Sequence, residues 1–433
     1  MRIMMMTNTY LPHVGGVARS VAAFTDAYRA QGHDVLVVAP EFAGVDPDEQ
    51  GVVRVSAVQN FNGSDFSMML PDSGRLTEAV ERFQPEIIHS HHPFLVGSAA
   101  LRLARQYAIP LVFTHHTMYE EYTHYVPVDS PLLKRFVATL STHYANNCHR
   151  VFAPRESVAA TLVARGVTVP IEILPTGVRT EHFTQGHGRG FRAALGIPRE
   201  AFVVGHVGRL APEKNLEFLT RCIAGFLARE PRAVALVVGS GPCVADMRKR
   251  FQAHRVAGRA HLLGSFDHPL LVSAYRAMDV FAFASKTETQ GMVLTEAMAA
   301  SVPVVALDAP GAREVVADRR NGRLLAHENE EAFVQALAWC AKLDPPDRLK
   351  LRRQARATAV RYALPRCAAR TLGIYAAVTR EFEAPEKSAY ALWDDAINRI
   401  SAEWTVLKGI AGAAGQALAS DELPPVPAAG AGG

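Results

Sequence analysis

FVVGHVGRLAPEKN, the stretch at residues 202–215, decides the fold. Its first six residues form a short apolar run with β-branched members, which is typical of a strand in a buried sheet. The run ends in the turn Gly208-Arg209, and Lys214 follows five residues later, at the start of the next helical pattern. Because ligands bind at the ends of parallel strands, this stretch predicts a doubly wound α/β domain with two cations at its ligand-binding edge.

Strand and helix patterns alternate downstream of this stretch. They are typical of a parallel sheet with helices on both faces. The predicted strands are 202–207, 233–238, 280–283 and 302–306, and the predicted helices lie near 216–228, 245–254, 293–300 and 331–341.

The same alternation fills the first part of the chain. Gly32 stands where a glycine ends a helix, and a strand follows it almost without a loop. Two Rossmann-like units are therefore expected, joined by the Gly- and His-rich linker at residues 184–190. The predicted strands are 2–7, 34–39, 86–89 and 110–114, and the predicted helices are 18–29 and 98–107.

Length and composition fit this division. The chain has 433 residues, too many for one ordinary core, and its 49% hydrophobic and 20% charged residues are typical of a folded protein. We predict domains over residues 1–183 and 184–362 that face each other across a cleft, a helix over 363–383 and an extension over 384–433. No run of about 18 apolar residues occurs, and the first apolar run is too short for a signal peptide, so a cytoplasmic protein is expected.

Charge and cysteine content restrict the partners. The net charge is −3 over residues 1–183, +10 over 184–383 and −3 over 384–433. The basic second domain suits an anionic ligand, although a solvated basic surface explains the charge equally well, and no nucleic-acid partner is expected. Five scattered cysteines without a C-x-x-C spacing indicate neither disulfides nor a zinc site.

The extension over 384–433 carries apolar residues at alternating steps of three and four. We interpret it as a helix that packs on its own domain or joins two subunits into a homodimer, in preference to a helix on a membrane surface. Residues 423–433 are rich in Pro, Ala and Gly, and a disordered tail is expected there. The stripe consists of Tyr390, Trp393, Ile397, Ile400, Trp404, Leu407, Ala411, Ala414 and Leu418.

Two cations at a strand end suit a reaction in which a nucleoside diphosphate departs. The leaving diphosphate gains negative charge, and without a metal ion that charge is met by fixed cations and backbone N–H groups. Arg209 and Lys214 would each contribute on the order of 4 kcal/mol at about 4 Å from a phosphate, before desolvation is subtracted. For this segment taken alone, a surface arginine and lysine beside a helix start are the alternative explanation.

A pair of carboxylates follows the predicted strand 280–283. Glu288 stands before the next helix and Glu296 lies on it, while Gly291 lets the backbone approach a phosphate at the helix N-terminus. One carboxylate can face a sugar and the other a ribose. Carboxylates at this spacing are common on solvated helices, but a pair behind a buried strand and beside a glycine favours a ligand site.

The loop between the first strand and the first helix contains Gly15-Gly16, which offers N–H groups to an anion across the cleft. A tight loop with positive φ explains the two glycines equally well. The loop lacks the G-x-G-x-x-G pattern, so a nicotinamide dinucleotide is disfavoured.

Five histidines follow two predicted strands and invite a metal-site interpretation. No carboxylate or thiolate stands at a suitable spacing, so a metal-dependent hydrolase is the weakest hypothesis. A D-x-D pattern at residues 46–48 lies far from any suitable strand end and is not expected to bind metal. The histidines are His89, His91, His92, His115 and His116.

Taken in order, these motifs resemble the family-4 retaining glycosyltransferases of the GT-B fold, over residues 1 to about 383. The Gly-Arg…Glu-Lys-Asn run and the pair Glu288…Glu296 are the most specific parts of the resemblance. It implies transfer of a hexose from a UDP- or GDP-sugar with retention of anomeric configuration, and neither a cofactor nor a catalytic metal. It also implies an acceptor-side first domain, a nucleotide-sugar-binding second domain, and a helix over 363–383 that returns to the first domain.

The resemblance assigns roles to single residues. Arg209 and Lys214 would clamp the diphosphate. Glu296 would hold the ribose hydroxyls and Glu288 the hexose, while His116 would lie near the donor sugar and the leaving-group oxygen. The implied catalytic residues are His116, Arg209, Lys214 and Glu288, and the implied donor-binding residues are Gly15, Gly16, Gly208, Arg209, Lys214, Gly291, Met292, Val293 and Glu296.

Residues 116–127 and 285–291 resemble the diacylglycerol glucosyltransferase branch of the family. This resemblance implies a membrane-lipid acceptor and peripheral contact with the inner face of the membrane. The apolar stripe downstream, beside two basic residues, fits an interfacial helix, although a core-facing helix has the same stripe. The −3 charge of the first domain weighs against strong electrostatic docking. The stripe is Leu133, Phe136, Val137, Leu140 and Tyr144, and the basic residues are Lys134 and Arg135.

Two other functions remain open from the sequence. One is a glycosyltransferase that acts on a soluble or polysaccharide acceptor, and the other is a sugar-nucleotide epimerase built on the same fold. Base, hexose and acceptor depend on loops that the motifs do not specify.

Overall fold

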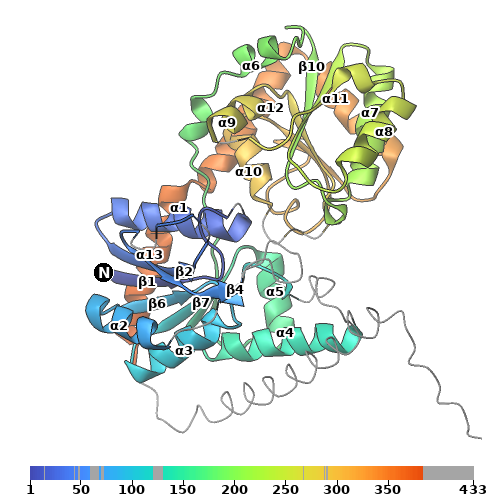
Figure 1. Cartoon of the computed structure of the whole chain (residues 1–433). Helices are drawn as coiled ribbons and strands as arrows, with labels where there is room; N and C mark the ends of the chain where they lie inside the picture. The colour runs from blue at the N-terminus through green and yellow to red at the C-terminus, as the bar shows by residue number, and fades with distance from the viewer. Residues whose placement is uncertain are drawn as a thin grey trace, which may run out of the picture.

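The computed structural model describes residues 1–383 apart from 14, 43, 47–48, 59–67, 70–72, 120–129, 267, 287 and 289–290. The extension over 384–433, with its predicted helix, homodimer contact and disordered tail, lies outside the described residues. Figure 1 shows two lobes, each built around its own sheet, with the last helix of the second half of the chain lying in the first lobe.

The first lobe contains a seven-stranded sheet in which every neighbouring pair of strands is parallel. The spatial order is β3-β2-β1-β6-β7-β8-β9, so the chain changes direction across the sheet beside β1. The strands are β1 (Arg2–Met6), β2 (Asp34–Pro40), β3 (Val52–Val55), β6 (Ile87–Ser90), β7 (Leu111–Thr114), β8 (Arg150–Ala153) and β9 (Ile171–Ile173), and a separate antiparallel pair is formed by β4 (Ala57–Val58) and β5 (Met68–Met69).

Helices cover both faces of this sheet. One face is covered by α1 together with α13, which returns from the far end of the chain and shares its apolar core with α1. The other face packs against α3 and α2. The helices are α1 (Gly16–Ala30), α2 (Ser73–Phe83), α3 (Val96–Gln106), α4 (Pro131–Asn146), α5 (Glu156–Ala164) and α13 (Leu364–Glu381).

The second lobe contains a six-stranded parallel sheet in the order β12-β11-β10-β13-β14-β15. Its two faces form two separate apolar cores, as expected for a doubly wound sheet. The strands are β10 (Phe202–Val207), β11 (Ala233–Val238), β12 (Ala260–Leu262), β13 (Val280–Phe283), β14 (Val304–Leu307) and β15 (Gly322–Leu325). The helices are α6 (Gly188–Ala194), α7 (Leu216–Arg229), α8 (Val244–Ala253), α9 (His268–Arg276), α10 (Met292–Ala299), α11 (Glu330–Lys342) and α12 (Pro345–Arg361), with short 3₁₀ turns at η3 (His182–Thr184), η4 (Pro212–Lys214) and η5 (Ala257–Arg259).

Local chemistry explains where several elements begin and end. Gly32 has φ +80° and its N–H donates to the carbonyl of Arg29, so it ends α1 in the left-handed conformation that glycine adopts readily. The strand predicted to begin at residue 302 begins at Val304 instead, because the N–H of Val302 donates to Ala297 and closes the end of α10. Pro303 has no N–H to pair in the sheet.

Residues 184–190, which the sequence indicates as a loose linker, are packed against α9. The turn η3 ends at Thr184 and α6 begins at Gly188. A Cβ atom on Gly188 would lie 2.3 Å from the carbonyl oxygen of Arg276. The glycine here therefore permits close approach of two segments rather than flexibility.

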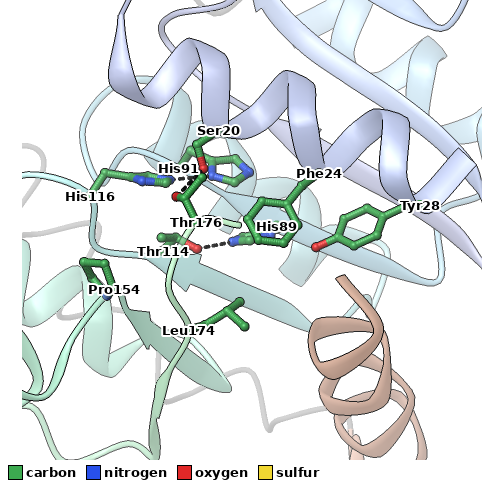
Figure 2. Close-up of a pocket in the computed structure, with 10 residues that line it drawn as sticks. All are labelled: Ser20, Phe24, Tyr28, His89, His91, Thr114, His116, Pro154, Leu174 and Thr176. Atoms are coloured by element: carbon green, nitrogen blue, oxygen red, sulfur yellow. Dashed lines mark hydrogen bonds between the residues drawn. The ribbon is translucent and has the colours of Figure 1, made fainter. Parts of the chain in front are cut away.

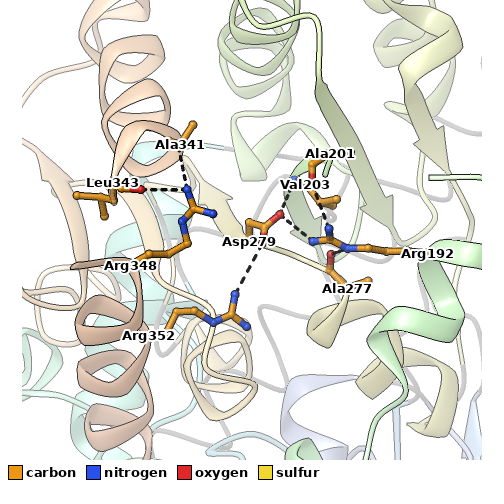
Figure 3. A network of polar contacts seen from close by, with 9 residues as sticks. All are labelled: Arg192, Ala201, Val203, Ala277, Asp279, Ala341, Leu343, Arg348 and Arg352. Carbon is orange, nitrogen blue, oxygen red and sulfur yellow. Dashed lines mark hydrogen bonds and ion pairs between the residues drawn. The ribbon is translucent and has the colours of Figure 1, made fainter. Parts of the chain in front are cut away.

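A polar network fixes the base of the second sheet (Figure 3). Asp279, at the start of β13, accepts hydrogen bonds from Arg192 of α6 at 2.7 Å and from the N–H of Val203 in β10 at 2.9 Å. Arg352 of α12 lies 3.8 Å from its other oxygen, and Arg348 donates to the last turn of α11, at the carbonyl of Ala341, and to the carbonyl that follows the helix, at Leu343. The carboxylate of Asp279 thus links α6 and α12 to β10 and β13 at the N-terminal ends of these two strands.

No helix in the described part of the chain is long and apolar enough to cross a membrane.

Candidate active site

The first helix presents its N-terminus at the end of β1. Gly15 is the N-cap of α1 in an extended conformation, and Gly16 is its first residue and is exposed. A Cβ atom on Gly16 would have no atom within 4 Å, so the space in front of this helix end is open. The unpaired N–H groups of a first helical turn attract anions, and the predicted phosphate contact of Gly15 and Gly16 is compatible with this geometry.

Across the cleft, the turn after β10 carries the two predicted cations. Arg209 is exposed and makes no hydrogen bond or ion pair with any residue that the structure describes. Lys214 ends the turn η4, and its Nζ donates to Glu288 in an ion pair whose side chains are 23% and 15% exposed. The pair holds the ammonium group of Lys214 beside the carboxylate of Glu288.

Two glycines after β11, which were not among the residues predicted from the sequence, hold this turn in place. A Cβ atom on Gly239 would lie 1.9 Å from the carbonyl oxygen of Gly208, and one on Gly241 would lie 2.3 Å from that of Leu210. The N–H of Leu210 donates to Ser240 at 2.8 Å. A G-S-G turn directly after a buried strand, as at residues 239–241, is the signal that would have identified them.

The predicted carboxylates flank the start of α10. Gly291 is its N-cap, with φ +60°, and Met292 and Val293 begin the helix, so their N–H groups have no partner within it. Glu288 is half-buried just before this turn. Thr287, Thr289 and Gln290 lie outside the described residues.

Glu296 lies one turn further along α10. It accepts a hydrogen bond from Tyr275 at 2.7 Å. Burial raises the pKa of Glu296 above its usual value, while that hydrogen bond and the positive charge of Arg19 act in the opposite direction. Arg19 is an exposed residue of α1, so the first domain presents a positive charge toward this carboxylate.

His116 lies on the first domain, in the segment that follows β7. Its Nε2 is 2.8 Å from Nδ1 of His91, which follows β6, and the two rings stack at 5.1 Å (Figure 2). Burial, and secondarily the neighbouring histidines, lower both pKa values well below the usual range. Both rings are therefore neutral near pH 7 and act through hydrogen bonds rather than charge.

The remaining histidines converge at the same sheet edge, and each has a partner. His89 lies 2.5 Å from the Tyr375 hydroxyl and 2.6 Å from the Thr114 hydroxyl. His92 accepts from the N–H of Asn8, and His115 contacts the Ser141 hydroxyl at 3.2 Å. No group of three or more His, Cys, Asp or Glu side chains in the described part of the chain is arranged to hold a metal ion.

A small pocket lies between α1 and the ends of the first sheet (Figure 2). The hydroxyls of Ser20 and Thr176 lie 2.8 Å apart on its wall. Nε2 of His91 is buried and has no hydrogen-bond partner among the described residues. The pocket is lined by Ser20, Phe24, Tyr28, His89, His91, Thr114, His116, Pro154, Leu174 and Thr176.

The structure thus brings Lys214, Glu288 and Gly291 together on the second domain, and places His116 with His91 on the first. Two further residues meet across the cleft, and the sequence analysis missed both. Arg155 donates to Glu314 at 3.3 Å although 159 residues separate them. Nothing in either local pattern signals that contact.

The chain matches two families of known proteins. Residues 14–182 match the family described as Glycosyltransferase Family 4, and residues 189–358 match the one described as Glycosyl transferases group 1. An alpha-monoglucosyldiacylglycerol synthase of Streptococcus pneumoniae is 28% identical over 78% of this chain and 78% of the relative. A GDP-mannose-dependent alpha-mannosyltransferase of Mycolicibacterium smegmatis is 30% identical over 78% of this chain and 87% of the relative.

A solved structure of the Anabaena protein Alr3699/HepE in complex with UDP has the same fold, with a TM-score of 0.70 and 19% identity over 87% of this chain and 100% of that one. The fold predicted from the sequence, two facing Rossmann-like domains, is confirmed.

Proposed function

Since this chain belongs to glycosyltransferase family 4 and is a glycosyltransferase of the GT-B fold, we propose that it transfers a hexose, with retention of anomeric configuration, from a nucleoside-diphosphate sugar to a hydroxyl of a membrane lipid such as diacylglycerol. The observation that carries the proposal is the ion pair of Lys214 with Glu288 beside the glycine-capped start of α10. It supplies one cation for a diphosphate and one carboxylate for a sugar within a single site.

In the proposed donor site, positively charged and N–H groups contact the diphosphate, and carboxylates contact the two sugars. Arg209 and Lys214 meet the negative charge that develops on the leaving diphosphate, together with the free N–H groups of Met292 and Val293 and those at Gly15 and Gly16. Glu296 and Glu288 accept hydrogen bonds from the ribose and the hexose. Because cations and N–H groups can meet this charge by themselves, we propose that the reaction needs neither a cofactor nor a metal ion.

His116 completes the site from the first domain. Its ring is neutral, so it can accept or donate one hydrogen bond to the donor sugar without adding charge beside the cations. We propose that its bond to His91 fixes the ring orientation. Among the described residues of the first domain no side chain stands out as a nucleophile. Attack on the same face of the sugar from which the leaving group departs agrees with the proposed retention.

The lipid acceptor is supported by the relatives and by α4. The relative from Streptococcus pneumoniae is named for a glucosyldiacylglycerol. On α4, the side chains of Leu132 and Phe136 are 72% and 41% exposed, beside Lys134 and the exposed Arg135. Exposed large apolar residues with adjacent basic ones are typical of a helix that rests on a lipid surface.

The remainder of the predicted stripe on α4 turns inward. Tyr144 is fully buried, Leu140 packs against the first core, and Leu133 and Val137 are half-buried. The helix therefore anchors its C-terminal half in the domain and leaves apolar side chains of its N-terminal half accessible. We propose peripheral attachment to the inner face of the membrane through this half of α4.

The test is a transfer assay with two vesicle compositions. Purified protein receives radiolabelled UDP-glucose or GDP-mannose together with anionic vesicles that either contain or lack diacylglycerol. We expect label in the organic extract only with diacylglycerol, and none with the Lys214→Ala variant. Label confined to a water-soluble product would replace the lipid acceptor by a soluble or polysaccharide one. Conversion of the free sugar nucleotide without transfer would indicate an epimerase.

A further inference from the structure

Glu314, in the loop between β14 and β15, is held from both sides of the interdomain cleft. The Ser157 hydroxyl donates to its Oε1 at 2.5 Å and Arg155 donates to its Oε2 at 3.3 Å, and both donors belong to the start of α5 in the first domain. The N–H of Gly311, in the same loop as Glu314, donates to Oε2 at 3.0 Å. The side chains of Arg155 and Glu314 are only 5% and 17% exposed, so this contact is largely shielded from water.

Gly311 connects this carboxylate to the donor-binding segment. Its φ is +94°, and a Cβ atom at this position would lie 2.8 Å from Cβ of Glu288. Its carbonyl oxygen is 3.7 Å from the corresponding position on Gly291. The loop of Glu314 therefore packs directly against Glu288 and Gly291, which precede α10, and Glu288 in turn pairs with Lys214. A displacement of Glu314 would therefore move Gly311, which contacts Glu288, the partner of Lys214.

The burial of Arg155 is not explained by a gain in folding stability. Burial lowers its pKa, and the attraction of Glu314, Tyr362 and Glu288 acts against that effect. Its Nε is buried and has no hydrogen-bond partner among the described residues. A buried donor without a partner lowers stability, and apolar side chains often replace buried ion pairs without loss of stability. The presence of Arg155 at this position favours a functional role.

We propose that Glu314, held by Arg155 and Ser157, is a positioning residue that makes the placement of Glu288 depend on contact between the two domains. The inference rests on the proposed function, since it concerns the same site. When the domains are in contact, the first domain holds Glu314, and Gly311 supports Glu288. When they separate, Glu314 keeps only the N–H of Gly311 among these three partners, and the support is lost.

This arrangement separates donor binding from transfer. The proposed nucleotide contacts Arg209, Lys214 and Glu296 lie on the second domain, those of Gly15 and Gly16 lie at the start of α1, and none of them involves Arg155 or Ser157. Removal of the first-domain partners therefore leaves nucleotide affinity unchanged and lowers turnover, because a misplaced reacting group lowers the rate steeply.

The experiment compares Arg155→Ala and Ser157→Ala with Arg155→Lys and with Arg150→Ala. Arg150 is the matched control, since it lies on the strand before Arg155 and pairs with Glu381 at 2.8 Å within the first domain. For Arg155→Ala we expect a UDP dissociation constant within twofold of wild type, measured by calorimetry, and a kcat with UDP-glucose lowered by about tenfold or more. Arg155→Lys should keep most of the activity because only one nitrogen of Arg155 contacts Glu314, and Arg150→Ala should match wild type.

A readout independent of activity is hydrogen exchange of the backbone over residues 308–316. Loss of Arg155 should speed exchange there, whereas loss of Arg150 should not. Arg155→Ala combined with Glu314→Ala should be no slower in turnover than the more impaired single variant, since both act through one contact. A kcat within twofold of wild type in Arg155→Ala, an equal fall in UDP affinity, or unchanged exchange would overturn the inference.

The two proposals fail separately. A wild-type enzyme that transfers no sugar, but whose Arg155→Ala variant shows faster exchange over 308–316, contradicts the proposed function and keeps the structural coupling. A wild-type enzyme that transfers sugar, with an equally active Arg155→Ala variant, contradicts the coupling alone. Ser157→Ala removes only a hydroxyl group, and it provides the kinetic comparison if Arg155→Ala unfolds.

Discussion

Lys214 and Glu288 neutralise each other at the mouth of the proposed donor site, in a pair whose side chains are about one-fifth exposed. A bound diphosphate would compete with Glu288 for the ammonium group of Lys214. Release from that pair would leave the Glu288 carboxylate available to a sugar hydroxyl. Arg209 has no such internal partner among the described residues and is exposed, so it is available to reorient onto a bound anion.

Lys214→Ala and Arg209→Ala are each expected to lower kcat by at least about 10²-fold, because each removes a charge that faces the developing diphosphate anion. Steady-state turnover with UDP- and GDP-sugars measures the loss. Lys249→Ala is the control, since Lys249 is 78% exposed on α8 and pairs only loosely, at 4.0 Å, with Asp246. Near-wild-type turnover in either site variant would remove that residue from the proposed clamp.

The two carboxylates should differ in their kinetic effects. Glu296→Gln is expected mainly to weaken donor binding, because ribose contacts are equal in the ground and transition states, whereas Glu288→Gln should also lower kcat. Calorimetry for the nucleotide and initial rates for turnover separate the two effects. Equal profiles for both variants would contradict the assignment.

Glu296 also makes a prediction about pH. Because its folded-state pKa is raised above 4.5, the folded protein binds this proton more tightly than the unfolded chain does. The ionised form therefore reduces stability at neutral pH, and the penalty shrinks as the pH falls through the folded-state pKa and is gone below the unfolded-state pKa of about 4.5. Glu296→Gln should raise the Tm at pH 7, and the gain should vanish at acidic pH. A Tm unchanged at both pH values would show that the carboxylate carries no such penalty.

At the scale of elements, the helix α4 carries buried apolar side chains in its C-terminal half and exposed ones in its N-terminal half. Its N-terminus is fixed by Ser130, whose side chain accepts from the N–H of Leu133 at 3.1 Å, and by Pro131 at the first helical position. Its C-terminal half packs in the first core through Tyr144. Leu132 and Phe136 contribute little to that core.

Leu132→Ser combined with Phe136→Ser should lower binding to anionic vesicles severalfold without a change in Tm, because these exposed side chains would enter the lipid surface. Flotation of the protein with vesicles measures the binding. Val163→Ser on α5 is the control, an apolar residue whose exposure of 61% lies between those of Leu132 and Phe136. Unchanged flotation of the double variant would exclude α4 as the membrane contact.

At the same scale, the network around Asp279 joins helices to strands and should contribute to the stability of the second domain (Figure 3). Asp279→Ala should lower the free energy of unfolding by about 3 kcal/mol, because it leaves Arg192 and Arg352 without their carboxylate and the N–H of Val203 without an acceptor. Asp308→Ala, which breaks the exposed pair with Arg313, should cost less than about 1 kcal/mol. Urea unfolding measures both, and equal losses would refute a special role for the network.

At the scale of the whole molecule, the chain crosses between the domains more than once. After completing the second domain, α13 returns and packs against α1, and its Tyr375 contacts both Tyr28 and His89. The domains are thereby joined by this covalent return, and Glu314 meets Arg155 and Ser157 across the cleft. The first domain is completed only when the end of the chain is in place.

Transfer activity should survive treatment with EDTA. The proposed mechanism meets the diphosphate charge with Arg209, Lys214 and backbone N–H groups, and the histidines at the end of the first sheet already have other partners. Initial rates after dialysis against EDTA, with and without added Mg²⁺ or Mn²⁺, provide the measurement. A rate that falls on chelation and returns with the metal would require a metal ion in the mechanism.

The sequence by itself determined the two-domain fold. Apolar runs of four to six residues become strands because a strand of a parallel sheet is buried on both faces and therefore consists almost wholly of apolar residues. The strands β10, β11 and β13 begin and end at the predicted residues. It missed α12, whose 17 residues bury only Leu351, Ala355, Thr358 and Ala359, so that almost no apolar stripe marks the helix. Capping by Asp344 and Pro345 was the available signal.

The sequence also placed the glycines, cations and carboxylates of the candidate site near strand ends, because the carboxyl ends of parallel strands meet at one edge. The tertiary structure decided which of them touch. The contact of Lys214 with Glu288 joins residues 74 apart in the chain, that of His91 with His116 joins residues 25 apart, and that of Arg155 with Glu314 joins residues 159 apart. Local patterns report the burial of each element and not its neighbours, so only the folded chain reveals the pairs.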